Sequence, residues 1–394
     1  MVLHMFEIID PSLPEPDVQA RAHSARVREV IANEIDAGDG FLPFDRYMQI
    51  VLYAPALGYY VAGARKFGAG GDFVTAPEMT ALFGTTLGVQ IAAILDATPD
   101  RQIVELGAGS GKLAADILAM LAANGKAAER YQIIEVSPEL RDRQHATIER
   151  LVPSELQRVE WLTDIPTTIA GAVVMNEVLD AIPPHVIARR GGVWFERGVT
   201  RQGDQFEWAD RTLVDERLLT LARRRFPAVV DYVSEINPAA EALVELIGRR
   251  LVFGALLIID YGFPRAEYYH RERSEGTLIG HYRHRVHTDP FLWPGLSDLT
   301  THVDLTAMVE AGERAGLTVG GFTSQASFLL SCGLLDRLRE VASPESLAYL
   351  REASAVQTLT SPSEMGESFK VLALARSENI AWPGFAFGDR SHRL

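Results

Sequence analysis

The spacing of apolar residues changes near residue 100. Before that point apolar side chains recur every three to four positions, which predicts amphipathic helices over 18–37, 44–52 and 75–95. The third helix opens with Thr75-Ala-Pro-Glu78, the pattern of a capping box with proline in the first turn. Five glycines between residues 58 and 71 predict a long loop. We therefore expect a mostly helical N-terminal region over 1–100.

From residue 101 onward, short apolar runs alternate with amphipathic stretches. The predicted strands are 103–106, 131–136, 159–162, 172–175 and 251–260, and two of the helices between them are 112–123 and 138–151. This alternation is typical of an α/β fold, a mostly parallel sheet covered by helices on both faces. A last strand over 368–375 is expected to close the sheet at its edge.

Two segments interrupt this alternation. Residues 185–199 alternate between apolar and polar and are split at Gly191-Gly192, and residues 205–212 continue the pattern. They predict an antiparallel meander inserted into the sheet domain. We place that domain at 101–394, with insertions at about 185–250 and 263–330.

Composition narrows the class of partner. Apolar residues make up 47% of the chain and charged residues 23%, as in an ordinary globular protein. The net charge of −14 argues against nucleic-acid binding, which depends on lysine and arginine at phosphates. An acidic surface could attract a basic protein substrate, or could serve solubility alone.

The location is predicted from three features. A single cysteine, Cys332, excludes an internal disulfide and favours a reducing compartment. Residues 1–15 lack the basic region of a secretory signal or transit peptide. The longest apolar run, 251–259, is too short to cross a bilayer. We expect a cytoplasmic bacterial protein without membrane insertion, or a matrix protein if the source is eukaryotic.

The segment Val104–Leu113 contains the most informative pattern. An apolar strand ends in Glu105, and a glycine turn (Gly107, Ala108, Gly109, Ser110, Gly111) leads into a helix. Glycines in such a turn let a ligand approach the backbone and the free N–H groups of the helix. Close packing of strand and helix also produces such turns, so both interpretations stay open.

Departures from two known motifs restrict the ligand. A dinucleotide fingerprint would have its third glycine at Lys112. A phosphate-binding P-loop would need glycine at Leu106 and serine or threonine at Leu113. The remaining pattern, Glu-x-Gly-x-Gly-x-Gly, is typical of methyltransferases that use S-adenosylmethionine (SAM).

Residues directly after the other strands face the same ligand edge. Glu135 follows the second strand and could accept both ribose hydroxyls, or could be a surface acid. Asp164 follows the third strand and could accept the adenine amine, although aspartate also starts turns.

Asn176, Glu177 and Asp180 follow the fourth strand. Carboxylates there could hold a guanidinium through paired hydrogen bonds, or could cap a short helical turn. An acid, Asp260, also follows the fifth strand. Zinc-type ligand spacing is absent, because His281, His284 and His287 lie among arginines without a cysteine or acid partner, and we expect no metal site.

Several long segments together resemble one family. They are 44–60 (FDRYMQIVLYAPALGYY), 71–78, 104–111, 176–181, 259–262, 276–291 (GTLIGHYRHRVHTDPF), 298–304 and 365–370. The chain is similar over 22–376 to the MidA-like SAM-dependent methyltransferases, which include a mitochondrial complex I assembly factor that methylates an arginine.

The resemblance implies a class I methyltransferase (Rossmann-like) sheet with SAM as cofactor. It implies that the N-terminal region completes the cofactor site and that Gly71, Asp72, Phe73 and Thr75 close over SAM beside the glycine turn. Asn176, Glu177 and Asp180 would be catalytic, and the acceptor would be an arginine of a protein, possibly a respiratory-complex subunit; an oligomer is left open. The alternatives are a SAM-binding assembly factor without catalysis, a small-molecule methyltransferase and, most distant, a nicotinamide oxidoreductase.

Overall fold

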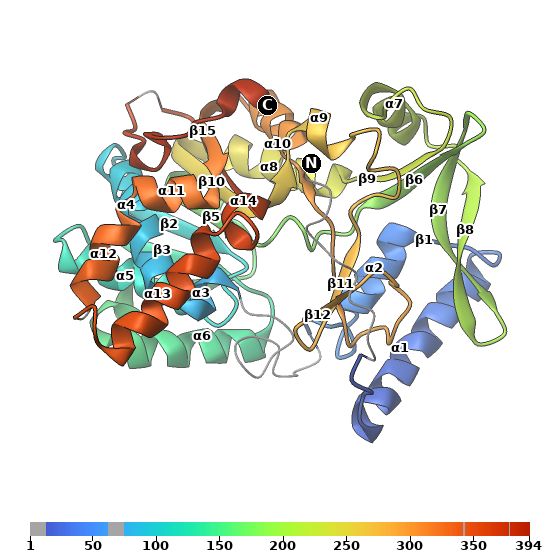
Figure 1. The fold of residues 1–394 in the computed structure, drawn as a ribbon, viewed down its shortest axis with the longest axis horizontal. Helices are drawn as coiled ribbons and strands as arrows, with labels where there is room; N and C mark the ends of the chain where they lie inside the picture. The colour runs from blue at the N-terminus through green and yellow to red at the C-terminus, as the bar shows by residue number, and fades with distance from the viewer. Residues whose placement is uncertain (1–12, 62–74, 342, 378) are drawn as a thin grey trace. The chain divides into compact units, whose positions relative to one another are not determined.

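The structure is a computed structural model that describes residues 13–61, 75–341, 343–377 and 379–394. The described chain divides into two compact units, each assembled from separate segments (Figure 1). The first unit contains 13–61, 180–240 and 265–303, and the second contains 75–179, 241–264 and 304–394, apart from residues 342 and 378. The unit boundary therefore does not coincide with the boundary at residue 100 expected from the sequence.

The second unit is built on a sheet with the strand order β15-β16-β10-β5-β2-β3-β4, and the short β14 also pairs with β10. The strands are β2 (Gln102–Leu106), β3 (Arg130–Ile134), β4 (Val159–Leu162), β5 (Ile169–Asn176), β10 (Leu251–Phe263), β14 (Val303–Asp304), β15 (Thr318–Ser324) and β16 (Phe369–Ala375). Along the main path only β16 runs against the others, so the predicted mostly parallel α/β sheet is confirmed.

The edge of this sheet differs from the prediction. The strand expected at the edge, β16, lies between β10 and β15, and β15 forms the edge instead. The sequence had placed the β15 residues in an insertion extending to about residue 330. Its Thr318-Val-Gly-Gly segment lacks a continuous apolar run, because the first three of these residues are exposed or only partly buried.

Helices cover the sheet of the second unit on both faces. They are α3 (Ala76–Met79), α4 (Ala81–Asp96), α5 (Lys112–Ala123), α6 (Pro138–Leu151), α8 (Pro238–Arg250), α10 (Leu305–Arg314), α11 (Gln325–Ser331), α12 (Leu334–Val341), α13 (Leu347–Thr360) and α14 (Met365–Ser368), with short 3-10 turns at Pro153–Arg158, Pro383–Phe385 and Ser391–Arg393. In β10, Ala255, Leu257 and Ile259 join the apolar cluster of α4, α5 and α11–α13, while Leu256 and Ile258 are buried on the opposite face. This double burial explains the uninterrupted apolar sequence of β10.

The helix predicted over 75–95 is broken at Thr80. Thr80 has an extended backbone (φ −158°, ψ 143°), and its hydroxyl accepts the Leu82 N–H at 3.0 Å as the cap of α4. The predicted capping box is wrong, because the Thr75 side chain makes no capping bond and Glu78 instead accepts a hydrogen bond from Ser110. The better cap, Thr80, lies five residues further along the same apolar pattern.

The first unit combines helices with two antiparallel sheets. Its helices are α1 (Val18–Ala37), α2 (Phe44–Tyr53), α7 (Glu216–Arg225) and α9 (Arg265–Tyr268). One sheet contains β1 (Leu42–Pro43), β6 (His185–Arg190), β7 (Val193–Gln202), β8 (Gln205–Thr212) and β9 (Tyr232–Ile236), and the other contains β11 (Ile279–Tyr282), β12 (Arg285–His287) and β13 (Asp298–Thr300).

The meander predicted from residues 185–212 is present, but it belongs to the first unit and not to the parallel sheet. Strand β7 pairs with β6, β8 and β1, and Leu42 of β1 lies opposite Val199. Val27, Ile31, Phe44 and Tyr47 of α1 and α2 share an apolar cluster with Val199 and other residues of this sheet. Burial of this apolar helix face against the sheet decides the pairing of distant segments. Within the described residues no helix is long and apolar enough to cross a membrane.

Candidate cofactor and acceptor site

The glycine turn connects the carboxyl end of β2 to the start of α5, as predicted. Gly107, Gly109 and Gly111 have φ angles of 70°, 53° and 83°, in the left-handed region that residues with a Cβ rarely adopt. A Cβ on Gly107 would lie 2.8 Å from Val178 Cγ2, and one on Gly111 would lie 2.9 Å from Gln144 Cα. A Cβ on Gly109 would meet no atom within 4 Å. The outer glycines therefore allow close packing, whereas Gly109 leaves space where a ligand can contact the backbone.

Gln144 connects the glycine turn to Glu135. Its side-chain NH₂ donates to the Gly109 carbonyl and to Glu135 Oε2, both at 3.1 Å, and its oxygen accepts the Trp161 indole N–H at 2.9 Å. Gln144 is fully buried on α6. Sequence reasoning missed it, because a glutamine nine residues after the acid in a polar helix carries no motif.

Glu135 lies just beyond β3, because β3 ends at Ile134 and not at residue 136 as predicted. Its backbone N–H donates to Leu162 O at 2.9 Å, and its Oε1 accepts the Ser137 N–H at 2.9 Å. The side chain is half-buried, and the neighbouring Val136 is 74% exposed. A carboxylate held by two donors, beside an open apolar side chain, fits the ribose and the adenine face of an adenosine.

Glu105 has a different environment from the one expected of a ligand contact. It is 1% exposed, and its carboxylate accepts the Tyr131 hydroxyl at 2.8 Å within β2 and β3. Burial raises the pKa of Glu105 to about 7. The structure therefore places this side chain in the core, where it connects β2 to β3 through Tyr131.

The segment before the turn also contributes a contact. Glu78 of α3 accepts a hydrogen bond from the Ser110 hydroxyl, so the start of α3 lies against the glycine turn. Thr75 is the residue that precedes α3. Gly71, Asp72 and Phe73 lie outside the described residues.

Asn176 is the last residue of β5, and Glu177 follows it. This end of β5 lies next to the glycine turn, since a Cβ on Gly107 would contact Val178. The Asn176 amide donates to Glu177 Oε1 at 3.1 Å, while Asn176 Oδ1 is buried and has no hydrogen-bond partner among the described residues. Glu177 adopts φ 54°, a strained conformation for a residue other than glycine. Such strain in a loop at the ligand edge is typical of functional positions.

Asp260 fixes this loop from the neighbouring strand. Its Oδ2 accepts the Leu179 N–H at 2.9 Å and its Oδ1 accepts the Tyr261 N–H at 2.8 Å, and the side chain is fully buried. The Glu177 N–H donates to the Ile259 carbonyl at 2.9 Å. β10 therefore positions the residues that follow β5.

Asp164 and Asp180 are the two remaining predicted site residues. Asp164 is exposed and follows β4 after Thr163, at the carboxyl edge of the sheet. Asp180 belongs to the first unit, where its backbone oxygen accepts the Thr301 N–H at 3.0 Å, and burial raises the pKa of its carboxyl group. The structure thus brings together the glycine turn, Glu135, Asn176 and Glu177 within the second unit.

The strand order, the single antiparallel strand β16 and the glycine turn define a class I methyltransferase. The model of a family of S-adenosyl-L-methionine-dependent methyltransferases matches residues 86–323, and the chain belongs to this family. The MidA-like resemblance is confirmed, and the protein is a methyltransferase that uses SAM.

Relatives with curated names are similar over most of the chain. The mitochondrial protein arginine methyltransferase NDUFAF7 of Mus musculus is 30% identical over 373 residues, covering 85% of this chain and 81% of the mouse protein. The mitochondrial NDUFAF7 homolog of Drosophila melanogaster is 28% identical and covers 93% of this chain and 89% of its own. A Burkholderia thailandensis protein solved with S-adenosyl-homocysteine is 46% identical, with a TM-score of 0.93, and covers 97% of this chain and 100% of its own.

Proposed function

We propose that this protein transfers the methyl group of SAM to a guanidinium nitrogen of a protein arginine. The curated relatives are named protein arginine methyltransferases, which supports this acceptor. The site residues support it through their hydrogen-bonding chemistry. A guanidinium has donors only, so it requires a cluster of acceptor oxygens.

The observation that carries the proposal is the pairing of Asn176 with Glu177. The Asn176 NH₂ group orients the Glu177 carboxylate, and the buried Asn176 Oδ1 has no donor among the described residues. One carboxylate and one amide oxygen at adjacent positions suit the two N–H edges of a guanidinium. Leaving a buried acceptor unsatisfied costs about 1–3 kcal/mol, which a bound donor would recover.

The proposed roles of the cofactor residues follow from their placement. SAM supplies an electrophilic methyl group when bound. Glu135 accepts the ribose hydroxyls, Val136 covers the adenine, and Asp164 accepts the adenine amine. Gly109 lets the ligand lie against the backbone. On the strength of the family resemblance, we propose that four further residues close over SAM: Gly71, Asp72, Phe73 and Thr75. Glu105, which ends the strand before the turn, is also proposed to belong to the cofactor site.

Glu177 holds the acceptor and takes the proton that its nitrogen loses when the new N–C bond forms. Asp180 is proposed as a further catalytic residue on the strength of the family resemblance, and its raised pKa suits a carboxyl that exchanges protons near neutrality. The N-terminal region, residues 1–100, is proposed to complete the cofactor site on the strength of the family resemblance.

We also propose a cytoplasmic location and a respiratory-complex subunit as the acceptor protein. The single cysteine supports a reducing compartment. The resemblance to a family that includes a mitochondrial complex I assembly factor supports the acceptor.

The test incubates the purified protein with isotope-labelled SAM and an extract of a strain that lacks the gene. Transfer of label to protein, with methyl-arginine found by mass spectrometry, is the expected result. Label in the small-molecule fraction would instead indicate a small-molecule methyltransferase. SAM binding without release of S-adenosylhomocysteine in any fraction would indicate an assembly factor that does not catalyse.

A further inference from the structure

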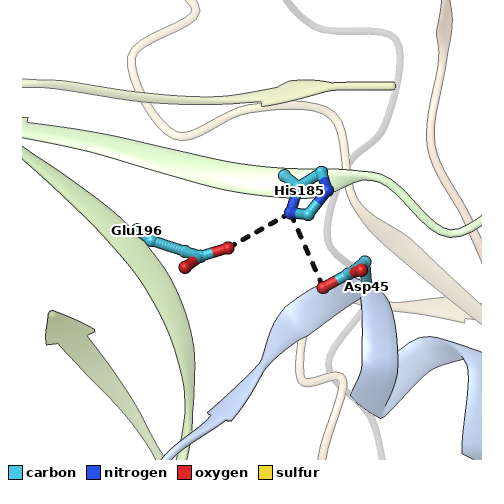
Figure 2. Close-up of side chains that lie close together, drawn as sticks. All are labelled: Asp45, His185 and Glu196. Atoms are coloured by element: carbon cyan, nitrogen blue, oxygen red, sulfur yellow. Dashed lines mark hydrogen bonds and ion pairs between the residues drawn. The ribbon is translucent and has the colours of Figure 1, made fainter. Parts of the chain in front are cut away.

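Three side chains of the first unit meet at a point that the methyl-transfer chemistry does not use. Asp45 lies in the first turn of α2, His185 begins β6, and Glu196 lies in β7 (Figure 2). Glu196 is opposite Ile187 in the β6–β7 register, so it shares a sheet face with His185 two residues earlier. The three come from parts of the sequence that only folding brings together.

The spacing of their ligand atoms fits a small cation. His185 Nδ1 lies 3.1 Å from Glu196 Oε1 and 3.6 Å from Asp45 Oδ1, and the three ligand atoms lie within 4.8 Å of one another. Tetrahedral zinc with bonds of about 2.0–2.1 Å places its ligand atoms roughly 3.3–3.4 Å apart. The distances of 3.1 Å and 3.6 Å from His185 Nδ1 lie on either side of this value.

The charges of the group are also unbalanced. Asp45 Oδ1 is buried and has no hydrogen bond within the described residues. One imidazole nitrogen faces two carboxylates, whereas a dication would neutralise both and leave the imidazole neutral.

We propose that Asp45, His185 and Glu196 bind a divalent transition-metal ion, zinc first among them, that joins α2 to strands β6 and β7. One imidazole and two carboxylates form a ligand set suited to zinc, manganese or iron(II), and zinc binds more tightly than the other two. Because methyl transfer from a sulfonium needs no metal, the ion would be structural. The sequence predicted no metal site because that prediction relied on ligands close together in the sequence. The three residues here are close together only in the folded structure.

The test uses the full chain without a polyhistidine tag, treated with a chelator and dialysed. Calorimetric titration with Zn²⁺ is expected to show one ion per chain, with a melting temperature that rises with the zinc concentration. Mg²⁺, which prefers six oxygen ligands, should produce neither effect. Co²⁺ should give the visible absorption of a four-coordinate site.

The variants His185→Gln and Glu196→Gln should each lose stoichiometric zinc binding. His284→Gln, at an exposed histidine of the same unit, and Glu207→Gln, at an exposed acid of β8, should bind zinc as the wild type does. SAM affinity and circular dichroism check that each variant folds. If His185→Gln does not fold, Asp45→Asn replaces it as the test variant.

Two results would overturn the proposal. Unchanged stoichiometric zinc binding by folded His185→Gln would locate the ion elsewhere. The second result is that the wild type binds no zinc and that His185→Gln is less stable than the wild type in chelator. This result would show an imidazolium ion paired with two carboxylates.

Discussion

The side-chain amide of Gln144 lies 3.1 Å from the Glu135 carboxylate and donates at the same distance to the backbone of the glycine turn. One buried residue therefore sets the distance between the two parts proposed to bind the ribose and the methionine end of SAM. If this connection is important, SAM binding depends on a side chain that does not itself touch the ligand.

Gln144→Ala should weaken SAM binding by roughly tenfold to a hundredfold. A hydrogen bond to a charged group contributes about 1.5–3 kcal/mol, and Glu135 would lose one of its two described donors. Calorimetry measures the change, and Gln157→Ala, at an exposed glutamine, is the control. If Gln144→Ala binds SAM with wild-type affinity, Gln144 has a packing role only. A double-mutant cycle with Glu135→Ala would show whether the two residues act together.

Gly109→Val and Glu135→Ala should each abolish SAM binding. A Val side chain at position 109 would occupy the open space beside the turn, and Glu135→Ala removes the proposed ribose acceptor. Gly125→Val is a matched control, because Gly125 also has a positive φ (65°) and open space around its Cβ position, but lies after α5. Wild-type affinity in both site variants, measured by calorimetry, would refute the site assignment.

Glu177→Gln should retain SAM affinity and lose methyl transfer, since the amide keeps the shape but not the charge. Glu177→Gly should also lose transfer, yet be as stable as the wild type or more so by about 1 kcal/mol, because glycine adopts φ 54° without strain. Urea unfolding and a labelled-SAM transfer assay measure the two effects. Glu129→Gln, at an exposed acid, is the control, and full transfer by Glu177→Gln would exclude the proposed role.

Glu105 should make stability depend on pH. Its folded pKa of about 7 exceeds the ordinary value of 4.5, so the folded state binds the proton more tightly. Its contribution is complete below about pH 4.5 and is lost as the pH rises to about 7, by at most about 3 kcal/mol. Relative to the wild type, Glu105→Gln should therefore gain stability across this interval. Equal pH profiles in urea unfolding would show that Glu105 titrates normally.

Tyr131→Phe tests the cause of that pH dependence. The Tyr131 hydroxyl donates to the Glu105 carboxylate and lowers its pKa, against the larger effect of burial. Without the donor, the pKa of Glu105 should rise further, and the loss of stability should extend to higher pH. A profile that shifts to lower pH would contradict this account.

Local sequence predicted several elements well. Helices α5 and α6 and strand β4 have the predicted bounds, because Gly111, Ser137-Pro138 and short apolar runs act over one helical turn or one strand. The break at Thr80 was missed because Thr75 and Thr80 are both acceptable caps. Which of them caps a helix depends on packing against the turn at Ser110, and that contact joins residues 32 positions apart.

The class of sheet, the glycine turn and the acids near the strand ends could be predicted from the sequence, since each depends on neighbours along the chain. Long-range packing was needed to show that β15 forms the sheet edge, that the 185–212 meander joins α1 and α2, and that Gln144 connects Glu135 to Gly109. It also brought Asp45 to His185 and Glu196. These relationships depend on the burial of apolar faces between distant segments. Because the hydrophobic effect is non-directional, a local apolar pattern shows that a face will be buried but not which segment will cover it.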